Sequence, residues 1–194
     1  MEKVELFKEN NKVIKTVTNF EDFKDVIRVF CEKPYYEILS DKDCEEEYNL
    51  YVEKGIVLGC YIDNKIVGIN CIVNEADKNH SIVFPEGSKV AYYSGLAVKE
   101  NCREHGSGKL LVYHTDKYLN DLKMYDYSYA RILCKGSMSQ GIFYKYGFRD
   151  AYDLDGNLIV DIPEYQKNTE SNILDERKYM VKKLVNDNPR FKRR

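Results

Sequence analysis

The stretch from Lys89 to Lys123, KVAYYSGLAVKENCREHGSGKLLVYHTDKYLNDLK, decides the fold of this 194-residue chain. Its first part, Val90 to Val98, is a continuous apolar run of the kind that forms a buried strand. A polar turn follows, and a helix is predicted from Gly106 to about Tyr125. The first amides of a helix lack partners inside the helix, and the helix dipole adds positive charge there. The sequence therefore predicts an anion site, suited to phosphate, where this helix begins.

The spacing of the glycines narrows the kind of phosphate ligand. Residues 103–108, REHGSG, read R-x-x-G-x-G, which is neither the dinucleotide fingerprint nor the nucleotide-binding loop. Together with the preceding GLAV at residues 95–98, this stretch resembles the acetyl-CoA loop of the GNAT N-acetyltransferase superfamily. In that superfamily, successive backbone amides of the loop hold the CoA pyrophosphate. A second motif, FYKYGF at residues 143–148, looks like the Y-x-x-x-G-F ending of the superfamily's next helix.

The rest of the chain has the element order that this resemblance implies. In the first part of the chain, apolar periodicity and turn residues predict a strand or hairpin over 3–17, helices over 20–33 and 40–55, and strands over 56–62 and 66–73. After the central helix they predict a strand over 127–134 and a short helix from Ser137 or Ser139 to Tyr146. Two last strands are predicted near 150–161 and 178–185, separated by a polar loop from 163 to about 176. The order βααβββαβαββ is that of the GNAT fold. We therefore expect one α/β domain over residues 1–194, with a mixed sheet of about seven strands flanked by about four helices.

Composition excludes several classes of partner. The formal net charge is only -2 and no long basic face is visible, which argues against nucleic acid. The chain has no apolar signal core and no run long enough to span a membrane, so we expect a cytoplasmic protein without a membrane partner. Six cysteines form no C-x-x-C pair, so no metal site is expected. Exposed edge strands near the C-terminus are compatible with a homodimer.

The resemblance implies direct transfer of an acetyl group from acetyl-CoA to a primary amine of a small-molecule or peptide acceptor. It implies a bulged backbone on the central strand whose amides lie near the thioester carbonyl, which here points to Gly95, Leu96, Ala97 and Val98. The amides of Leu96 and Val98 are also expected to pair with the pantetheine arm, as an added strand would. The expected cofactor-binding residues after that strand are Arg103, His105, Gly106, Ser107, Gly108 and Lys109, with Ser139 from the next helix. His105 is expected to contribute its backbone, and Lys109 fits a solvated first-turn lysine equally well.

The proton donor is the point at which the chain departs from its relatives. Family members usually place a tyrosine five residues before the final phenylalanine of the second motif, and Phe143 occupies that position here. Tyr144 is therefore the best candidate for the catalytic acid, although it points about 100° away on an ideal helix. The alternative is that the CoA thiolate takes a proton from water or from the acceptor ammonium.

The acceptor side is marked by an acidic helix start, Asp41 to Glu47, which lies where this family lines its acceptor cleft. Its carboxylates attract a cationic amine, or they only complement the helix dipole as a solvated first turn. Two functions stay open: an enzyme, or a catalytically silent acyl-CoA-binding module. Only the enzyme predicts thiol release from acetyl-CoA in the presence of an amine. The sequence names neither the acceptor nor the general base.

Overall fold

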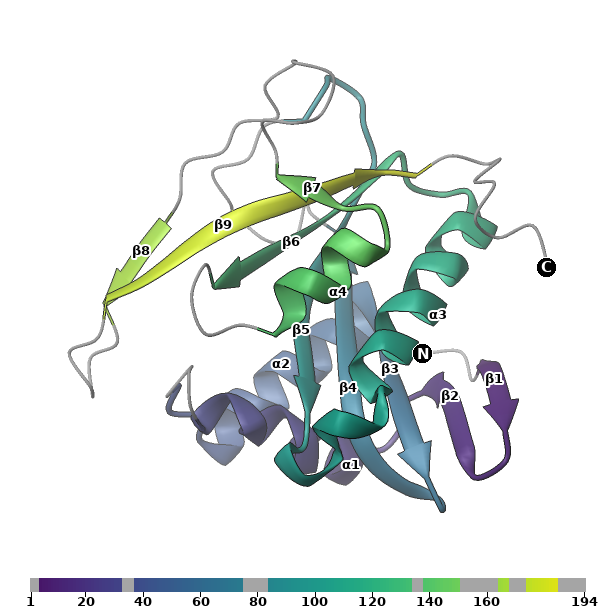
Figure 1. Ribbon diagram of the computed structural model, residues 1–194. Coiled ribbons are helices and arrows are strands. Elements are labelled where there is room, and N and C mark those ends of the chain that lie inside the picture. The colour runs from purple at the N-terminus through teal and green to yellow at the C-terminus, as the bar shows by residue number, and fades with distance from the viewer. Residues whose placement is uncertain are drawn as a thin grey trace.

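A mixed β-sheet with helices on both faces forms the centre of the computed structural model, which describes residues 4–32, 37–74, 84–133, 138–150, 164–167 and 174–184 (Figure 1). The strands are β1 (Glu5–Glu9), β2 (Lys12–Thr16), β3 (Gly55–Ile62), β4 (Lys65–Asn74), β5 (Val90–Val98), β6 (Tyr127–Leu133), β7 (Arg149–Asp150), β8 (Glu164–Lys167) and β9 (Leu174–Lys183). They follow the order β1-β2-β3-β4-β5-β6-β9-β7, and β8 pairs with β9. The β5–β6 pair is parallel and the others are antiparallel.

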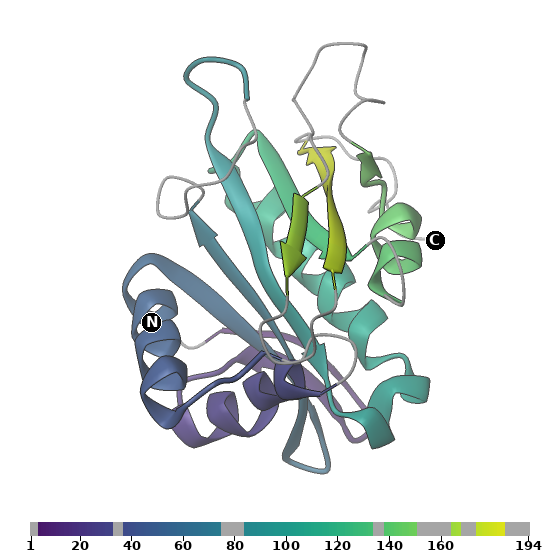
Figure 2. The ribbon, with the colours of Figure 1, turned by 90° about the vertical axis from the view of Figure 1, so that its left-hand side faces the viewer.

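The helices form one layer on each face of the sheet (Figures 1 and 2). The α-helices are α1 (Phe20–Ile27), α2 (Asp41–Lys54), α3 (Ser107–Leu122) and α4 (Ser139–Lys145), and the 3-10 helices are η1 (Arg28–Cys31) and η3 (Glu100–His105). Phe23 of α1 and Tyr51 of α2 pack in one buried cluster with Ile69 of β4. Val112 of α3 and Phe143 of α4 pack in a second cluster on the opposite face. The predicted mixed sheet with helices on both faces is therefore confirmed.

Local sequence signals explain where several elements begin and end. Ser40 caps α2 in a reciprocal capping box, in which its side chain accepts from the Asp43 amide and the Asp43 carboxylate accepts from the Ser40 amide. Asp63 and Asn64 both have positive φ, as a two-residue turn between β3 and β4 requires. Gly147 has φ of 91° just after α4, the usual left-handed ending of a helix.

The strand pattern differs from the expected one in the number of strands and in the polar loop. Within the described residues, the sheet has nine strands, where about seven were expected. Residues 5–16 form the hairpin of β1 and β2, and β8 lies inside the predicted polar loop, where the expectation of an unstructured connection was wrong. A polar segment can form a strand when its backbone pairs with an existing edge, and β8 pairs with β9 in this way. The strand expected over 150–161 falls mostly on residues 151–163, outside the described residues.

One buried histidine gives the fold a pH dependence. His114 of α3 is 8% exposed and packs with ring centroids 4.6 Å from Phe7 of β1. Burial, and secondarily the charge of Lys117, lower the pKa of His114 from 6.5 to about 4. The unfolded chain therefore binds this proton first, and folding stability is lost as the pH falls from 6.5 towards 4.

We expect the titration of His114 to lower the free energy of unfolding by up to about 3 kcal/mol over this pH range, because one pKa unit corresponds to about 1.4 kcal/mol. Urea unfolding of the His114→Phe protein at several pH values should show a shallower loss of stability than wild type. The exposed His105 is the matched control, and His105→Gln should keep the wild-type slope. Equal slopes for wild type and His114→Phe would show that His114 is not the group that titrates.

Candidate functional site

Strand β5 changes its pairing at Ser94. On the β4 side, Tyr93 lies opposite Ile72 and Gly95 lies opposite Cys71, so Ser94 is an extra residue that forms a β-bulge. On the other side, the parallel pairing with β6 runs only from Val90 to Tyr93. The two strands therefore separate after Tyr93, and the second half of β5 has an edge that β6 does not cover.

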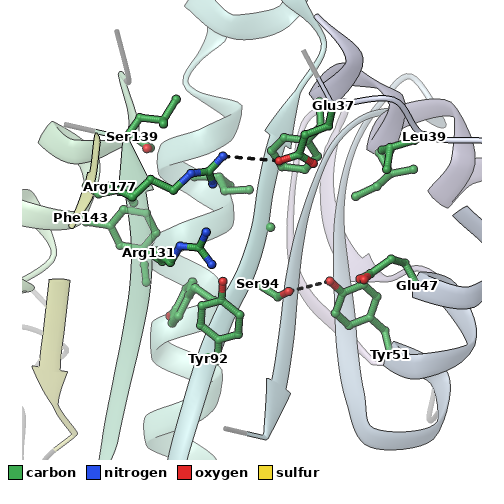
Figure 3. A pocket seen from close by; sticks show the side chains of 18 residues that line it. Glu37, Leu39, Glu47, Tyr51, Tyr92, Ser94, Arg131, Ser139, Phe143 and Arg177 are labelled. Carbon is green, nitrogen blue, oxygen red and sulfur yellow. Dashed lines mark hydrogen bonds and ion pairs between the residues drawn. The ribbon is translucent and has the colours of Figure 1, made fainter. Parts of the chain in front are cut away.

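A cavity of about 190 Å³ lies where β5 and β6 separate (Figure 3). Residues of β5 line it, including Ser94, Gly95 and Leu96, which was predicted to bind the cofactor. The predicted Ser139 and also Phe143 reach it from α4. The bulge and the strand separation thus create a chamber in the middle of the sheet.

The two walls of this chamber carry opposite charges. Glu37, from the segment before α2, and Glu47, from α2, lie on one side. Arg131 of β6 and Arg177 of β9 lie on the other (Figure 3). An Arg177 nitrogen lies 3.6 Å from a Glu37 carboxylate oxygen, across the chamber. Burial raises the pKa of Glu37, and the charge of Arg177 opposes this rise.

A hydroxyl pair anchors the bulge to the acidic wall. The Tyr51 hydroxyl of α2 donates to Ser94 Oγ at 2.8 Å (Figure 3). Burial raises the pKa of Tyr51 well above its ordinary value, so its phenol remains protonated and keeps its donor. The contact therefore fixes the extra residue of β5 against α2.

The predicted anion site lies at the start of α3, just past the end of β5. Gly106 adopts a left-handed conformation with φ of 76°, and a Cβ at this position would meet nothing within 4 Å. No side chain caps the helix, while the Gly106 carbonyl accepts from the Leu110 amide at 3.0 Å. The amides of Ser107, Gly108 and Lys109 belong to the first helical turn, whose N–H groups have no partner inside the helix.

The charged residues around this helix start are held by specific contacts. Arg103 Nε donates to the Val98 carbonyl at 3.1 Å, so its guanidinium is fixed at the end of β5. His105 is exposed, and its carbonyl accepts from Lys12 Nζ of β2 at 3.0 Å. Lys12 adds a positive charge that sequence reasoning missed, because 93 residues separate it from His105. Lys109 is exposed.

These features fit a diphosphate group. An uncapped helix start with an unobstructed glycine offers backbone donors and partial positive charge, and Arg103, Lys109 and Lys12 add full charges close by. The loop also adjoins the strand predicted to hold the pantetheine arm. A Cβ on Gly108 would lie 3.6 Å from Val98 Cγ2, and Ala97 is buried beside Val98 on that strand.

The catalytic candidate Tyr144 lies in a different environment from Phe143. Its hydroxyl donates to Asp150 Oδ2 at 2.8 Å and accepts from Lys178 Nζ at 2.8 Å. Lys178 also forms an ion pair with Asp150 at 2.7 Å. Phe143, by contrast, is 2% exposed and lines the chamber. Tyr144 is not among the described residues that line it, and its role as the acid stays a prediction.

Sequence comparison identifies the family. Residues 20–148 match the family model described as Acetyltransferase (GNAT) family. The chain belongs to the GNAT family of acetyltransferases. The resemblance seen in the two glycine motifs is thereby confirmed, and the protein is an acyltransferase. No curated protein is similar enough in sequence to match this GNAT chain.

Solved structures share the fold of this GNAT protein at low sequence identity. Ard1 from Thermoplasma volcanium is 16% identical, with a TM-score of 0.62, and the match covers 91% of this chain and 99% of that one. The putative acetyltransferase yncA from Salmonella typhimurium, solved with acetyl-CoA, is 11% identical, with a TM-score of 0.63 and coverage of 91% and 95%. Arabidopsis thaliana Naa50, in complex with the bisubstrate analogue CoA-Ac-MVNAL, is 14% identical, with a TM-score of 0.61 and coverage of 89% and 99%.

The described residues show neither a cluster of metal ligands nor a membrane-spanning helix. No group of three or more His, Cys, Asp or Glu side chains in this part of the chain is placed to hold a metal ion. Within the same ranges, no helix is both long enough and apolar enough to cross a membrane.

Proposed function

We propose that this GNAT protein is an N-acetyltransferase that moves the acetyl group of acetyl-CoA to a primary amine by direct attack. The observation that carries the proposal is the separation of β5 from β6 after Tyr93. It leaves an uncovered edge of β5 between the chamber at Ser94, whose walls carry ionisable groups, and the uncapped start of α3, which is suited to a diphosphate. A cofactor bound along this edge and an acceptor in the chamber can therefore meet at the bulge.

The reaction makes three demands on the chain. The acceptor ammonium must lose a proton before its nitrogen can form a bond to the thioester carbon. Negative charge that develops on the carbonyl oxygen needs hydrogen-bond donors. The carbon–sulfur bond then breaks, and the thiolate of CoA leaves and takes up a proton.

The chain offers groups for the first two demands and for holding the cofactor. The carboxylates of Glu37 and Glu47 line the chamber and can accept the proton of the ammonium. At the uncovered edge of β5, Leu96 and Val98 supply backbone groups for the pantetheine arm and, next to the bulge, for the carbonyl oxygen. The start of α3, with Arg103, His105, Gly106, Ser107, Gly108 and Lys109, holds the diphosphate.

Glu47 is expected to attract the amine. It lies in the chamber, whereas Glu45 and Glu46 are exposed on α2. Glu47→Gln should lower kcat/KM for a cationic acceptor by about 2- to 5-fold, mainly through KM, because a partly exposed charge pair contributes up to about 1 kcal/mol. The loss should shrink at high salt. The matched control, Glu45→Gln with Glu46→Gln, should leave KM unchanged. If Glu47→Gln also leaves KM and its salt dependence unchanged, the acidic helix start acts only as a solvated face.

Tyr144 is expected to help the thiolate leave. A thiolate with a pKa near 8.5 is a tolerable leaving group, so Tyr144→Phe should lower kcat by about tenfold without abolishing turnover. Because the hydroxyl also bonds Asp150 and Lys178, Asp150→Asn serves as the control that disturbs the same cluster and keeps the phenol. Full turnover of Tyr144→Phe across the pH range would remove Tyr144 from the mechanism, and so would an equal loss in Asp150→Asn.

Thiol release tests the proposed function. Purified protein with acetyl-CoA and a panel of primary amines should release free CoA thiol at a rate that depends on the amine. A catalytically silent acyl-CoA-binding module would instead show a CoA-dependent rise in melting temperature and no amine-dependent thiol. Absence of both signals would contradict CoA binding itself.

A further inference from the structure

The chamber is lined by two arginines, and binding of a cationic amine does not require positively charged side chains. Arg131 and Arg177 form its basic wall, and both would repel a simple cationic amine. The acidic wall, Glu37 and Glu47, already supplies what an ammonium group needs. The basic wall therefore indicates that the acceptor brings a negative group of its own.

Arg177 has hydrogen-bonding capacity that its protein contacts leave unused. Its side chain is only 13% exposed, yet its distance of 3.6 Å to Glu37 is longer than a hydrogen bond. Its Nε is buried and meets no hydrogen-bond partner in the part of the chain that the structure describes. A guanidinium has five N–H donors in a planar fork, and removal from water makes an unfilled donor costly. Arg177 is thus prepared for an acceptor of hydrogen bonds that enters the chamber.

We propose that the acceptor carries a carboxylate close to its amine, and that Arg177 binds this carboxylate; the inference rests on the acetyl transfer proposed above. The planar fork of Arg177 matches a carboxylate in two parallel hydrogen bonds. Arg131, from the neighbouring strand β6, adds a second positive charge on the same wall.

The position of Glu37 completes the argument. Its carboxylate is the present partner of Arg177, at a distance that shows an ion pair without close contact. When a substrate carboxylate replaces Glu37 as the partner of Arg177, the Glu37 carboxylate faces the ammonium end of the same substrate molecule. The two charged walls therefore match the two ends of a zwitterion, within a space several times the roughly 30 Å³ share of one water molecule.

The carboxylate can come from a free amino acid or from an acidic first residue of a peptide. Two arms of one experiment separate these sources. The first compares kcat/KM for free amino acids with their decarboxylated amines, such as phenylalanine with phenethylamine. The second compares peptide amides that begin with aspartate with those that begin with asparagine. The wild-type enzyme should prefer the carboxylated member in at least one arm.

Variants of Arg177 test the assignment. Arg177→Gln should reduce the preference, expressed as the ratio of the two kcat/KM values, by about 10- to 100-fold, as expected for a hydrogen bond between charged groups. Arg177→Lys should keep part of it, because the charge stays while the fork is lost. Glu37→Gln combined with Arg177→Gln should lose the preference too, and it avoids a lone charge if Arg177→Gln folds poorly. Lys183→Gln, an exposed charge change on the same strand, should keep the wild-type ratio.

Three results would overturn the inference. The first is equal kcat/KM for both members of each pair in wild type, and the second is a ratio that Arg177→Gln leaves unchanged. In both cases acetyl transfer to amines still stands, so the proposed function survives. The third is thiol release that no amine accelerates, which removes the proposed function and this inference together.

Discussion

Gly106→Asp should weaken acetyl-CoA binding by roughly 100-fold while α3 still forms. The added side chain meets open space, since a Cβ at Gly106 has nothing within 4 Å. Aspartate tolerates the left-handed conformation better than most residues and is a favourable helix cap. Its carboxylate, however, would sit where the diphosphate is expected. A like charge 4 Å away costs about 1 kcal/mol in bulk water and about 4 kcal/mol at an effective dielectric constant of 20, and about 1.4 kcal/mol is tenfold in affinity.

Gly106→Asn is the matched control, because asparagine has nearly the same shape and the same tolerance of positive φ without the charge. Calorimetric titration should give a Kd for Gly106→Asn within about tenfold of wild type and a much weaker one for Gly106→Asp, with the difference reduced by salt. Similar affinities for the aspartate and asparagine proteins would contradict the placement of the diphosphate at the start of α3.

Asp116→Leu should destabilise the fold by about 3–5 kcal/mol, the usual cost of breaking a buried ion pair by removing one member. Asp116 of α3 and Lys182 of β9 form an ion pair whose side chains are 1% and 7% exposed. Removing the carboxylate would leave the ammonium of Lys182 in an apolar cluster, 6.0 Å from the centre of the Phe148 ring. This pair matters for the site, because it ties the strand that carries Arg177 to the helix that begins at Gly106.

The double variant Asp116→Leu with Lys182→Met should recover most of this loss, because it removes both buried charges at once. Urea unfolding of the two proteins gives the comparison. If the single and double variants are equally stable, the ion pair contributes little and another contact must hold β9 against α3.

Features set by neighbouring residues could be predicted from the sequence. The glycine loop at residues 106–108, the cap at Ser40 and the stop at Gly147 each follow from the conformational preferences of a few adjacent residues. The departure at Phe143 was also visible, since it needs only a count along one helix. These local signals were enough for the family and for the mixed sheet.

Features that depend on pairing between distant segments could not be predicted from the residues alone. The family resemblance implied a bulge near Gly95, but its place at Ser94 depends on the register of β4, and the uncovered edge after it depends on where β6 stops pairing. Arg177 reaches Glu37 across 140 positions of sequence, and neither lies in a motif. β8 forms because an edge of β9 is available to a polar segment. The charged walls of the chamber are therefore a property of the fold.

The most direct test of acetyl transfer follows the acetyl group itself. Acetyl-CoA labelled with carbon-13 in the acetyl group is incubated with the protein and the amine that gives the fastest thiol release, and the products are analysed by mass spectrometry and NMR. The account predicts a labelled amide on the amine nitrogen, formed in step with free CoA and strongly reduced in Gly106→Asp at low acetyl-CoA. Free CoA without a labelled amide, or label that remains on the thioester with every amine, would contradict it.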